Sequence, residues 1–326
     1  MKRFGITLGD PCGIGAEITL KALSADTRYR QNALLFGTLS MLDYYRERLG
    51  YDFQFNTITA IEEWREGFIN VYDPLPVPRG AIEIGKVTAL GGEIAFQSVV
   101  AAIAFAQRGD ITSVVTAPLS KEAMHRAGHN YAGHTEIFGK YTKGEHYAML
   151  LYSEKLKVIH ISTHVSLRAA CDAVTFERVL TVIRLADQTL KKIGYAQPRI
   201  AVAGLNPHAG EHGLFGDEEI EEIIPAIEAA RGEGIAAEGP IAPDTVFLKA
   251  VQGAYDIVVA MYHDQGHIPL KLLAFDSGVN ITVGLDVIRT SVDHGTAFDI
   301  ADTLIAKEES LLEAIKVGML LNSGDR

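Results

Sequence analysis

The feature that most restricts the possible folds of this chain is a repeated pattern in which an apolar, strand-length segment runs into a histidine. It occurs three times, with 157–162 before His164, 199–204 before His208 and 255–260 before His263. In an open α/β sheet the carboxyl ends of parallel strands share one edge, and ligands bind just outside it. The pattern therefore predicts a largely parallel sheet with these histidines along one edge. A hydrogen-bonded structural role is the alternative for any single one of them.

Three neutral imidazoles are also a coherent set of ligands. Imidazole binds divalent transition metals, and three of them leave coordination positions open for a substrate, as a catalytic site requires. All 11 histidines lie between His125 and His294, which indicates a site assembled from the middle of the sequence. We therefore expect His164, His208 and His263 to bind one divalent ion.

The remaining segments alternate between strand-like and helix-like patterns. Strands are expected at 4–8, 33–36, 68–72, 112–116 and 279–283, helices at 39–49, 91–108, 176–193 and 217–231, and a hairpin at 147–152 with 157–162. Such alternation predicts an α/β fold with a mainly parallel sheet and some antiparallel strands. The densely polar segment 128–136 has little apolar periodicity and is expected to be a functional loop.

Composition limits the classes of function. With 326 residues the chain is long enough for two domains, and its formal net charge of −11 argues against a general nucleic-acid-binding surface. An anionic substrate must therefore be held by a local basic pocket. No apolar run is expected to approach the length of a membrane span, and Gly9-Asp10-Pro11 interrupts the apolar start too early for a signal peptide. We expect a cytoplasmic protein without nucleic-acid or membrane partners.

A glycine-rich turn at 9–17 follows the first expected strand. It lacks the G-x-G-x-x-G spacing of a dinucleotide site, and its Asp and Pro would sit badly beneath a pyrophosphate. A tight structural turn is therefore the preferred interpretation.

A second group of residues is suited to bind an anion. Lys271 and Arg289 flank an expected strand that contains Asn280, and His134 and Thr135 lie upstream in the polar segment. Two cations with an amide and a hydroxyl make a receptor for a phosphate or a carboxylate. Ordinary surface charges are the alternative for the two cations.

Five longer motifs resemble those of the 4-hydroxythreonine-4-phosphate dehydrogenase family, namely 133–136, 204–211, 243–245, 262–266 and 289–297. The resemblance implies an isopropylmalate-dehydrogenase-like fold of two α/β/α domains with a cleft between them. The first domain would comprise 1–130 plus 270–326, and the second, 131–269, would carry the metal ligands and the dimer interface. The resemblance also implies a homodimer whose active site is shared across the interface, with NAD-linked oxidation followed by decarboxylation of a small phosphorylated hydroxy acid.

The same resemblance assigns roles to particular residues. It implies that His164, His208 and His263 bind the metal, and that His134, Thr135, Lys271, Asn280 and Arg289 bind the substrate. Asn206, Gly210, His294, Gly295, Thr296 and Asp299 are the expected cofactor-binding positions, and Lys271, Asp244 and Asp264 the expected catalytic residues. The stretch 294–299 resembles the adenosine-binding loop of isopropylmalate dehydrogenases, so NAD would bind without the glycine fingerprint. The metal stays open among zinc, cobalt, magnesium, manganese and nickel.

Two stretches, 116–121 and 266–271, are more similar to a second branch of the family. That branch resembles dehydrogenases that act on 4-phosphates of four-carbon sugar acids, such as 4-phospho-D-threonate and D-erythronate. His267 is a candidate for sensing the hydroxyl that replaces an amine in these substrates, and a structural role is its alternative. The other hypotheses are a dehydrogenase of 4-phosphooxy-L-threonine in pyridoxal phosphate biosynthesis, a metal-dependent hydrolase of a phosphorylated metabolite, and an inactive phosphate-binding module.

Overall fold

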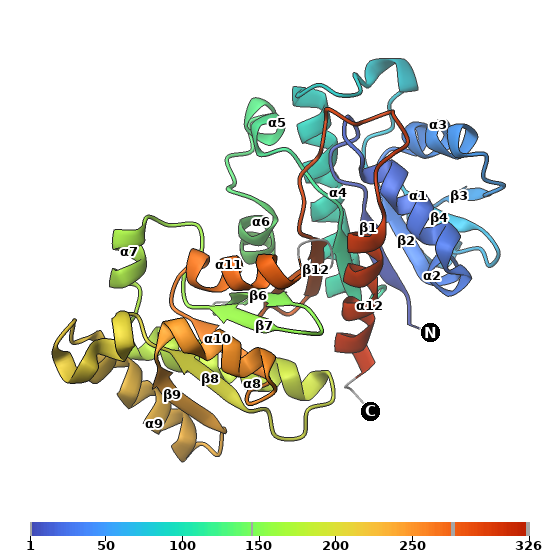
Figure 1. The fold of residues 1–326 in the computed structure, drawn as a ribbon. Coiled ribbons are helices and arrows are strands. Elements are labelled where there is room, and N and C mark those ends of the chain that lie inside the picture. The colour runs from blue at the N-terminus through green and yellow to red at the C-terminus, as the bar shows by residue number, and fades with distance from the viewer. Residues whose placement is uncertain (1, 145, 275–277, 324–326) are drawn as a thin grey trace. The chain divides into compact units, whose positions relative to one another are not determined.

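The computed structural model describes residues 2–144, 146–274 and 278–323, which form two compact units (Figure 1). Unit 1 comprises residues 1–144 and 285–319, and unit 2 comprises residues 145–284 and 320–326. The chain passes from unit 1 to unit 2 after Gly144 and returns to unit 1 after Gly284. The resemblance implied boundaries after residues 130 and 269.

The six strands of unit 1 are all parallel to their neighbours in this unit. Their order is β3 (Phe55–Thr57), β4 (Ile69–Tyr72), β2 (Ala33–Phe36), β1 (Phe4–Thr7), β5 (Ser113–Thr116) and β12 (Ile288–Val292). The accompanying helices are α1 (Gly15–Ala25), α2 (Thr27–Asn32), α3 (Leu39–Leu49), α4 (Ala89–Gln107), α5 (Lys121–Arg126), α6 (His134–Tyr141) and α12 (Glu309–Ser323), with short 3-10 turns at Ile61–Glu63 and Arg79–Ala81. Parallel strands of this kind need helical crossovers, as the sequence pattern predicted.

Helix α4 forms the centre of the unit 1 core, because it packs against β1, β2 and β5 and against α5 and α6. It is 19 residues long and is the one helix in the described ranges that is long and apolar enough to cross a membrane. The expectation that no apolar segment reaches that length was therefore wrong. More than half of its most apolar window, 56%, is buried inside the protein, which is the behaviour of a core helix.

Unit 2 contains the antiparallel strand that the hairpin pattern predicted. Its order is β11 (Val279–Val283), β6 (Ala148–Tyr152), β7 (Lys157–His160), β10 (Ile257–Ala260), β8 (Ile200–Ala203) and β9 (Ala237–Ile241). Strand β6 is antiparallel to both β7 and β11, and the other pairs are parallel. The prediction of a mainly parallel α/β sheet with some antiparallel strands is confirmed.

Helices cover both faces of the unit 2 sheet. They are α7 (Leu167–Asp172), α8 (Phe176–Lys192), α9 (Ile224–Gly232), α10 (Pro243–Val251) and α11 (His263–Ala274), with a π-helical turn η4 (Glu219–Ile223) before α9. Val158 and Val258 share a core with Val246 of α10 and Leu270 of α11. Because side chains alternate along a strand, the intervening residues face the opposite side, where α8 packs on β7, β8 and β10.

One local expectation was wrong, and a second segment had been given no secondary structure. The polar segment 128–136 is not a loop throughout, because α6 begins at His134 and places Ile137 and Phe138 in the unit 1 core. The polar residues after 255–260 are likewise helical, since α11 begins at His263 and continues through Pro269. In both cases the helix buries apolar residues further along the chain, and this packing stabilises it. A short window of polar residues does not indicate that stabilisation.

Candidate functional site

The carboxyl edge of the unit 2 sheet brings two of the predicted metal ligands together. His164 follows β7 and His263 begins α11 directly after β10, and β7 and β10 are neighbouring parallel strands. The ring centroids of His164 and His263 are 5.8 Å apart. Both residues line a cavity of about 330 Å³. The other lining residues are Thr163, Val165, Leu167, Ala170, Tyr262 and Asp264. The sequence pattern therefore placed these two imidazoles correctly at one edge.

The imidazole of His263 is oriented by neighbours on its own helix. Its Nδ1 lies 2.6 Å from Asp264 Oδ1, which leaves Nε2 for a ligand. One turn further along, His267 stacks on His263 with centroids 3.6 Å apart and an interplanar angle of 11°. A carboxylate on the far nitrogen of an imidazole is the usual support of a metal ligand. Asp264, predicted as catalytic, is thus positioned to orient His263.

Behind this pair lies a buried second pair of histidines. His267 Nδ1 lies 3.0 Å from the backbone oxygen of His263, and burial, followed by the nearby His263, lowers the pKa of His267 to about 4. The ring of His160 lies 4.8 Å from that of His267, and burial lowers the pKa of His160 to about 3. His160 Nε2 is buried without a hydrogen-bond partner. Both rings are therefore neutral near pH 7.

His208 is placed differently from the other two predicted metal ligands. It is exposed, its ring lies 6.2 Å from that of Phe215, and residues 208–212 all have φ in the left-handed region. Within residues 2–144, 146–274 and 278–323, no three His, Cys, Asp or Glu side chains are grouped as a metal site. One chain therefore presents a pair of adjacent imidazoles, His164 and His263, and not the predicted three.

The left-handed turn that carries His208 is held by a buried carboxylate. Glu219 Oε1 accepts hydrogen bonds from the backbone N–H groups of Leu205 and Asn206 at 2.7 and 2.8 Å. The Asn206 side-chain amide donates to Glu218 and Glu219 at 2.7 and 2.9 Å. At Gly210, whose φ is +78°, a Cβ would lie 2.7 Å from Glu219 Oε2. Asn206 and Gly210, predicted to bind the cofactor, have structural contacts here, and their cofactor role stays a prediction.

Three further predicted residues of unit 2 lie on separate elements. Lys271 is exposed on α11, two turns after His263, and its charge helps to lower the pKa of His267 after burial and His263. Asp244 is exposed in the first turn of α10. Asn280 is on β11, and its side-chain oxygen is buried without a hydrogen-bond partner. A buried, unsatisfied acceptor is costly, which makes Asn280 suited to receive a donor from a ligand.

Unit 1 contains the predicted anion receptor around Arg289. Arg289 lies on β12 and is only 3% exposed. Its Nη2 and Nε donate to Thr116 Oγ1, at 3.1 and 3.3 Å, and its Nη1 lies 3.5 Å from Thr135 Oγ1. Burial lowers the pKa of Arg289 to about 9, and the charge of Glu136 partly opposes this shift. A buried guanidinium among hydroxyl groups is a strong receptor for an oxyanion.

His134 completes this anion site at the start of α6. Its Nε2 is buried without a hydrogen-bond partner, and burial and then the charge of Arg289 hold its pKa well below the usual value. His134 and Thr135 lie at the first two positions of α6, where free backbone N–H groups favour an anion. His134, Thr135 and Arg289 thus come together as predicted, and Thr116 joins them. A threonine at a strand end gives no such signal in the sequence.

The loop 294–299 packs against the glycine-rich turn of unit 1. Ile14 N–H donates to Thr296 O at 3.2 Å, and a Cβ on Gly13 would lie 2.7 Å from the same oxygen. A Cβ on Gly9, whose φ is +67°, would lie 2.0 Å from Pro118 O. These glycines are occupied by backbone contacts, so the interpretation as a tight structural turn is confirmed. His294, Gly295 and Asp299 are exposed and open to a ligand.

Two buried residues of unit 2 were not singled out from the sequence, although they fix the histidine edge. Gln265 is buried, and its Oε1 accepts a hydrogen bond from Met261 N–H at 2.6 Å. Its Nε2 donates to Gly204 O at 2.9 Å. These two hydrogen bonds connect the ends of β10 and β8. Glu219 holds the turn before His208. Both are polar residues inside helices, where composition alone suggests a solvated face.

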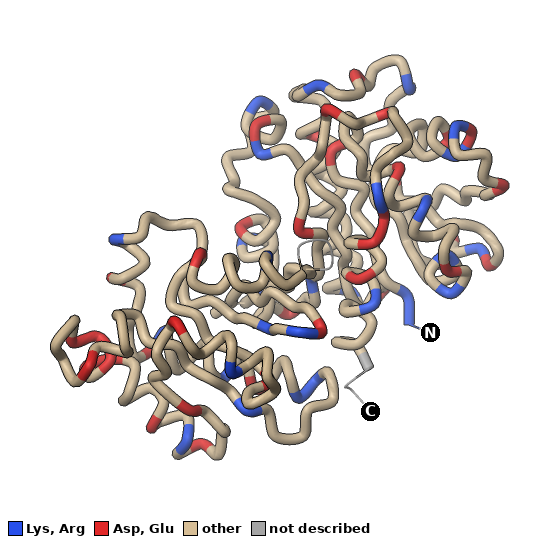
Figure 2. The backbone as a smooth tube through the Cα atoms, in the orientation of Figure 1, with Lys and Arg blue, Asp and Glu red and all other residues tan. Residues whose placement is uncertain are grey.

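Charge is unevenly distributed in unit 2. Figure 2 shows acidic residues gathered around η4, which contains Glu219, Glu221 and Glu222, and basic residues near the turn between β6 and β7. The residues predicted to bind an anion are local basic features within a chain of net charge −11. A mixed α/β fold with an oxyanion receptor and a histidine pair beyond strand ends is typical of enzymes that act on small anionic metabolites.

Comparison with known proteins identifies the family. The model of the family described as pyridoxal phosphate biosynthetic protein PdxA matches residues 29–318. D-threonate 4-phosphate dehydrogenase of Salmonella typhimurium is 53% identical over 324 residues, 98% of this chain and 99% of that protein. This chain belongs to the PdxA family, which confirms the resemblance.

Solved structures agree with this assignment. The crystal structure of 4-hydroxythreonine-4-phosphate dehydrogenase from Klebsiella pneumoniae superimposes with a TM-score of 0.87 at 48% identity, covering 98% of this chain and 99% of that one. Isocitrate dehydrogenase from Methylococcus capsulatus gives a TM-score of 0.51 at 16% identity, covering 100% of this chain and 87% of that one. The second likeness shows a shared fold alone, and it agrees with the dehydrogenase fold expected from the sequence.

Proposed function

We propose that this chain is an NAD-dependent dehydrogenase that oxidises and decarboxylates the 4-phosphate of a four-carbon hydroxy acid. The observation that carries the proposal is the buried Arg289 with His134, Thr135 and Thr116 around it, in a chain that belongs to a family of dehydrogenases. A buried guanidinium beside two threonine hydroxyl groups is suited to bind a phosphate in a bidentate manner.

We propose 4-phospho-D-threonate or its D-erythronate isomer as the substrate. Support comes from the relative named D-threonate 4-phosphate dehydrogenase, at 53% identity. A structure named 4-hydroxythreonine-4-phosphate dehydrogenase follows closely at 48% identity, so 4-phosphooxy-L-threonine is the alternative substrate. The two substrates differ in one hydroxyl or amine beside the carboxylate. His267, stacked on His263, is the candidate residue for distinguishing the hydroxyl from the amine.

The chain's own residues can be given roles in this reaction. Arg289, His134 and Thr135 would hold the phosphate, and Lys271 would be a further donor to the substrate. The side-chain oxygen of Asn280 would accept from a substrate hydroxyl. His164 and His263 would hold a divalent ion, and the exposed loop 294–299 would receive the adenosine of NAD. When bound, the ion would polarise the substrate hydroxyl and the nicotinamide would accept a hydride. Lys271, Asp244 and Asp264 are the candidates for moving the proton.

We further propose that the metal site is completed across a homodimer. The support is that His208 does not join His164 and His263 within the described part of one chain. Large apolar side chains are also exposed on α7, α10 and α11 of unit 2, with Leu167 at 64%, Leu248 at 61%, Ile268 at 57% and Leu272 at 82%. Apolar residues exposed together in this way mark an interaction surface. A second copy of the chain would supply His208 and cover these residues.

Nicotinamide absorbance, recorded substrate by substrate, tests the activity. Turnover is expected with 4-phospho-D-threonate or D-erythronate and NAD, and very little with the unphosphorylated acids. Equal oxidation of phosphorylated and unphosphorylated acids would contradict the phosphate assignment. Release of inorganic phosphate without reduction of NAD would support the metal-dependent hydrolase instead.

Subunit complementation tests the shared metal site. His208→Ala and His263→Ala should each abolish turnover while leaving the fold intact, because each removes a ligand of the same ion. If the ligands come from different chains, mixing the two inactive variants should restore part of the activity. Light scattering at the assay concentration should show a dimer. A monomer with full activity would rule out the shared site.

A further inference from the structure

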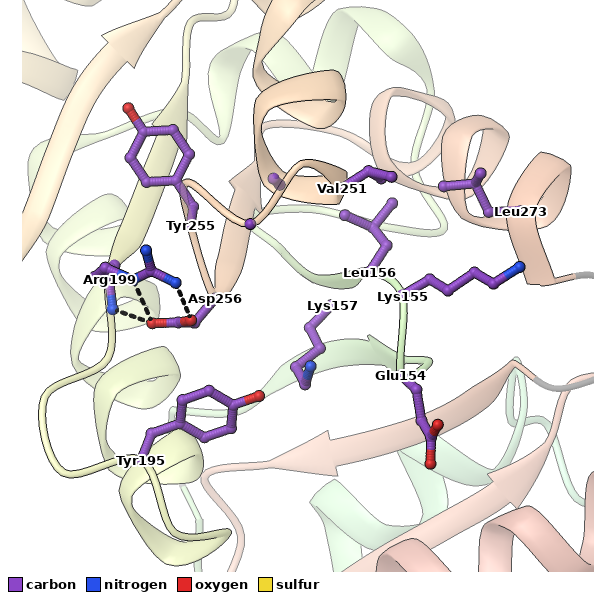
Figure 3. A pocket seen from close by; sticks show the side chains of 12 residues that line it. Glu154, Lys155, Leu156, Lys157, Tyr195, Arg199, Val251, Tyr255, Asp256 and Leu273 are labelled. Atoms are coloured by element: carbon purple, nitrogen blue, oxygen red, sulfur yellow. Dashed lines mark hydrogen bonds and ion pairs between the residues drawn. The ribbon is translucent and has the colours of Figure 1, made fainter.

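Unit 2 contains a second cavity, and Figure 3 shows the side chains that line it. Its volume is about 580 Å³. Lys157 is the first residue of β7, and Arg199 and Asp256 immediately precede β8 and β10. These residues therefore lie at the amino ends of three neighbouring parallel strands, whereas His164 and His263 follow the carboxyl ends. The cavity has no part in the proposed dehydrogenase reaction.

The cavity contains a cation that the protein does not neutralise with an ion pair. Lys157 is only 7% exposed, and in the described ranges no carboxylate oxygen lies within ion-pair distance of its ammonium. The Nζ lies 5.1 Å from the ring centroid of Tyr152 and 5.5 Å from that of Tyr195. Aromatic faces offset only part of the cost of removing an ammonium from water. Figure 3 shows Lys157 among the side chains that line the cavity.

The other charged residues around the cavity do not neutralise the Lys157 ammonium. Arg199 Nη2 and Asp256 Oδ1 are 2.7 Å apart, and two further hydrogen bonds join the same residues. This closed pair supplies no net charge to the cavity. At the rim, the exposed Lys155 and Glu154 carry opposite charges, so Lys157 is left as the net charge of the cavity. The surroundings of Lys157 therefore favour a bound anion.

The remaining wall of the cavity is apolar. Leu156 is 3% exposed, whereas Val251 and Leu273 are 39% and 37% exposed on the same cavity. A free inorganic anion would contact only the ammonium and would leave these side chains against water. A ligand that joins a carboxylate to an apolar body would use both parts of the cavity.

We propose that this cavity is a second ligand site, which binds a small organic acid with its carboxylate on Lys157 Nζ. The apolar body of the acid lies against Leu156, Val251 and Leu273. The site is separate from the anion receptor at Arg289, because all of its residues belong to unit 2.

Titration calorimetry of the full-length protein with benzoate and hexanoate tests the proposal. Both acids are expected to bind, while benzyl alcohol and inorganic phosphate should bind at least about tenfold more weakly at this site, since each lacks one of the two features. Lys157→Met should weaken benzoate binding by about tenfold or more, which corresponds to loss of ~1.4 kcal/mol. Lys192→Met, which removes an exposed lysine of α8 outside the cavity, is the matched control and should bind benzoate normally.

Two further variants keep the result interpretable. Arg289→Met should retain benzoate binding, which separates this site from the anion receptor in unit 1. Lys157→Gln provides a second loss of charge if the methionine variant misfolds, as judged by circular dichroism. Absence of benzoate binding to the wild type, or unchanged binding in both Lys157 variants, would overturn the proposal. Loss of binding in Arg289→Met would assign the acid to the active site instead.

Discussion

Among the described residues, unit 1 and unit 2 each contain one buried Lys or Arg side chain, and the surroundings of the two differ. Arg289 is 3% exposed and is contacted by the hydroxyl groups of Thr116 and Thr135. Lys157 is 7% exposed and is flanked by two tyrosine rings beside an apolar wall. A guanidinium is a planar fork that matches two oxygens of a phosphate, whereas an ammonium is a point charge. The difference indicates a geometrically selective anion site in unit 1 and a more tolerant one in unit 2.

The largest expected difference between the two cations is in catalysis. Arg289→Met should lower kcat/KM for the phosphorylated substrate by ~30-fold or more, because losing a charged hydrogen bond to a buried anion costs ~2–5 kcal/mol. Lys157→Met should change kcat/KM less than about twofold, since its cavity lies away from the histidine edge. Steady-state kinetics of both variants measure this. A large loss in Lys157→Met would show that the two sites are not independent.

Exchange of the two cations tests the importance of their shapes. Arg289→Lys should still lower kcat/KM by about tenfold, because an ammonium cannot contact two phosphate oxygens in the same plane. Lys157→Arg should alter benzoate affinity by only about threefold or less. If Arg289→Lys were fully active, charge alone would suffice in unit 1, and the distinction between the sites would fail.

The smallest expected effect concerns acid stability near Arg289. Since the pKa of His134 is depressed in the folded chain by burial and by Arg289, the unfolded chain binds one more proton below pH ~6.5. The contribution of His134 to stability is therefore present at neutral pH and is lost as the pH falls. Between pH 7 and pH 5.5 the free energy of unfolding should fall by ~1 kcal/mol more in the wild type than in His134→Gln. Urea denaturation at both pH values measures this, and equal losses would contradict it.

Much of the fold was predictable from apolar periodicity, whereas strands with weak patterns were not. The helix expected at 39–49 is α3 (Leu39–Leu49), and the predicted hairpin is the antiparallel pair β6 and β7. Strand β9 was missed because it contains Gly239 and Pro240, and β12 because its central residues are Arg, Thr and Ser. Both segments are strands because they pair with a neighbouring strand, and the sequence of one segment does not indicate such pairing.

The site residues were predictable where they directly follow the end of a strand. They were less predictable where their position depends on residues of another element. Parallel pairing of β7 and β10 follows from the pattern, and it brings His164 close to His263. The position of His208 depends on a left-handed turn that Glu219 holds from a later element, which no local rule predicts. Lys157 was not singled out either, because a lysine at the start of a strand gives no sign that aromatic side chains will bury it.

The left-handed turn at 208–212 has a consequence for the order in which unit 2 becomes ordered. Each residue other than glycine costs roughly 1–2 kcal/mol in that conformation, so the turn cannot persist before η4 packs beside it and supplies the Glu219 carboxylate. The amides of Leu205 and Asn206 report on this contact directly, because both donate to Glu219. In native-state hydrogen exchange they should open together, at a lower free energy than the amides of β8. His208 would then reach its working position only after the sheet beneath it is complete.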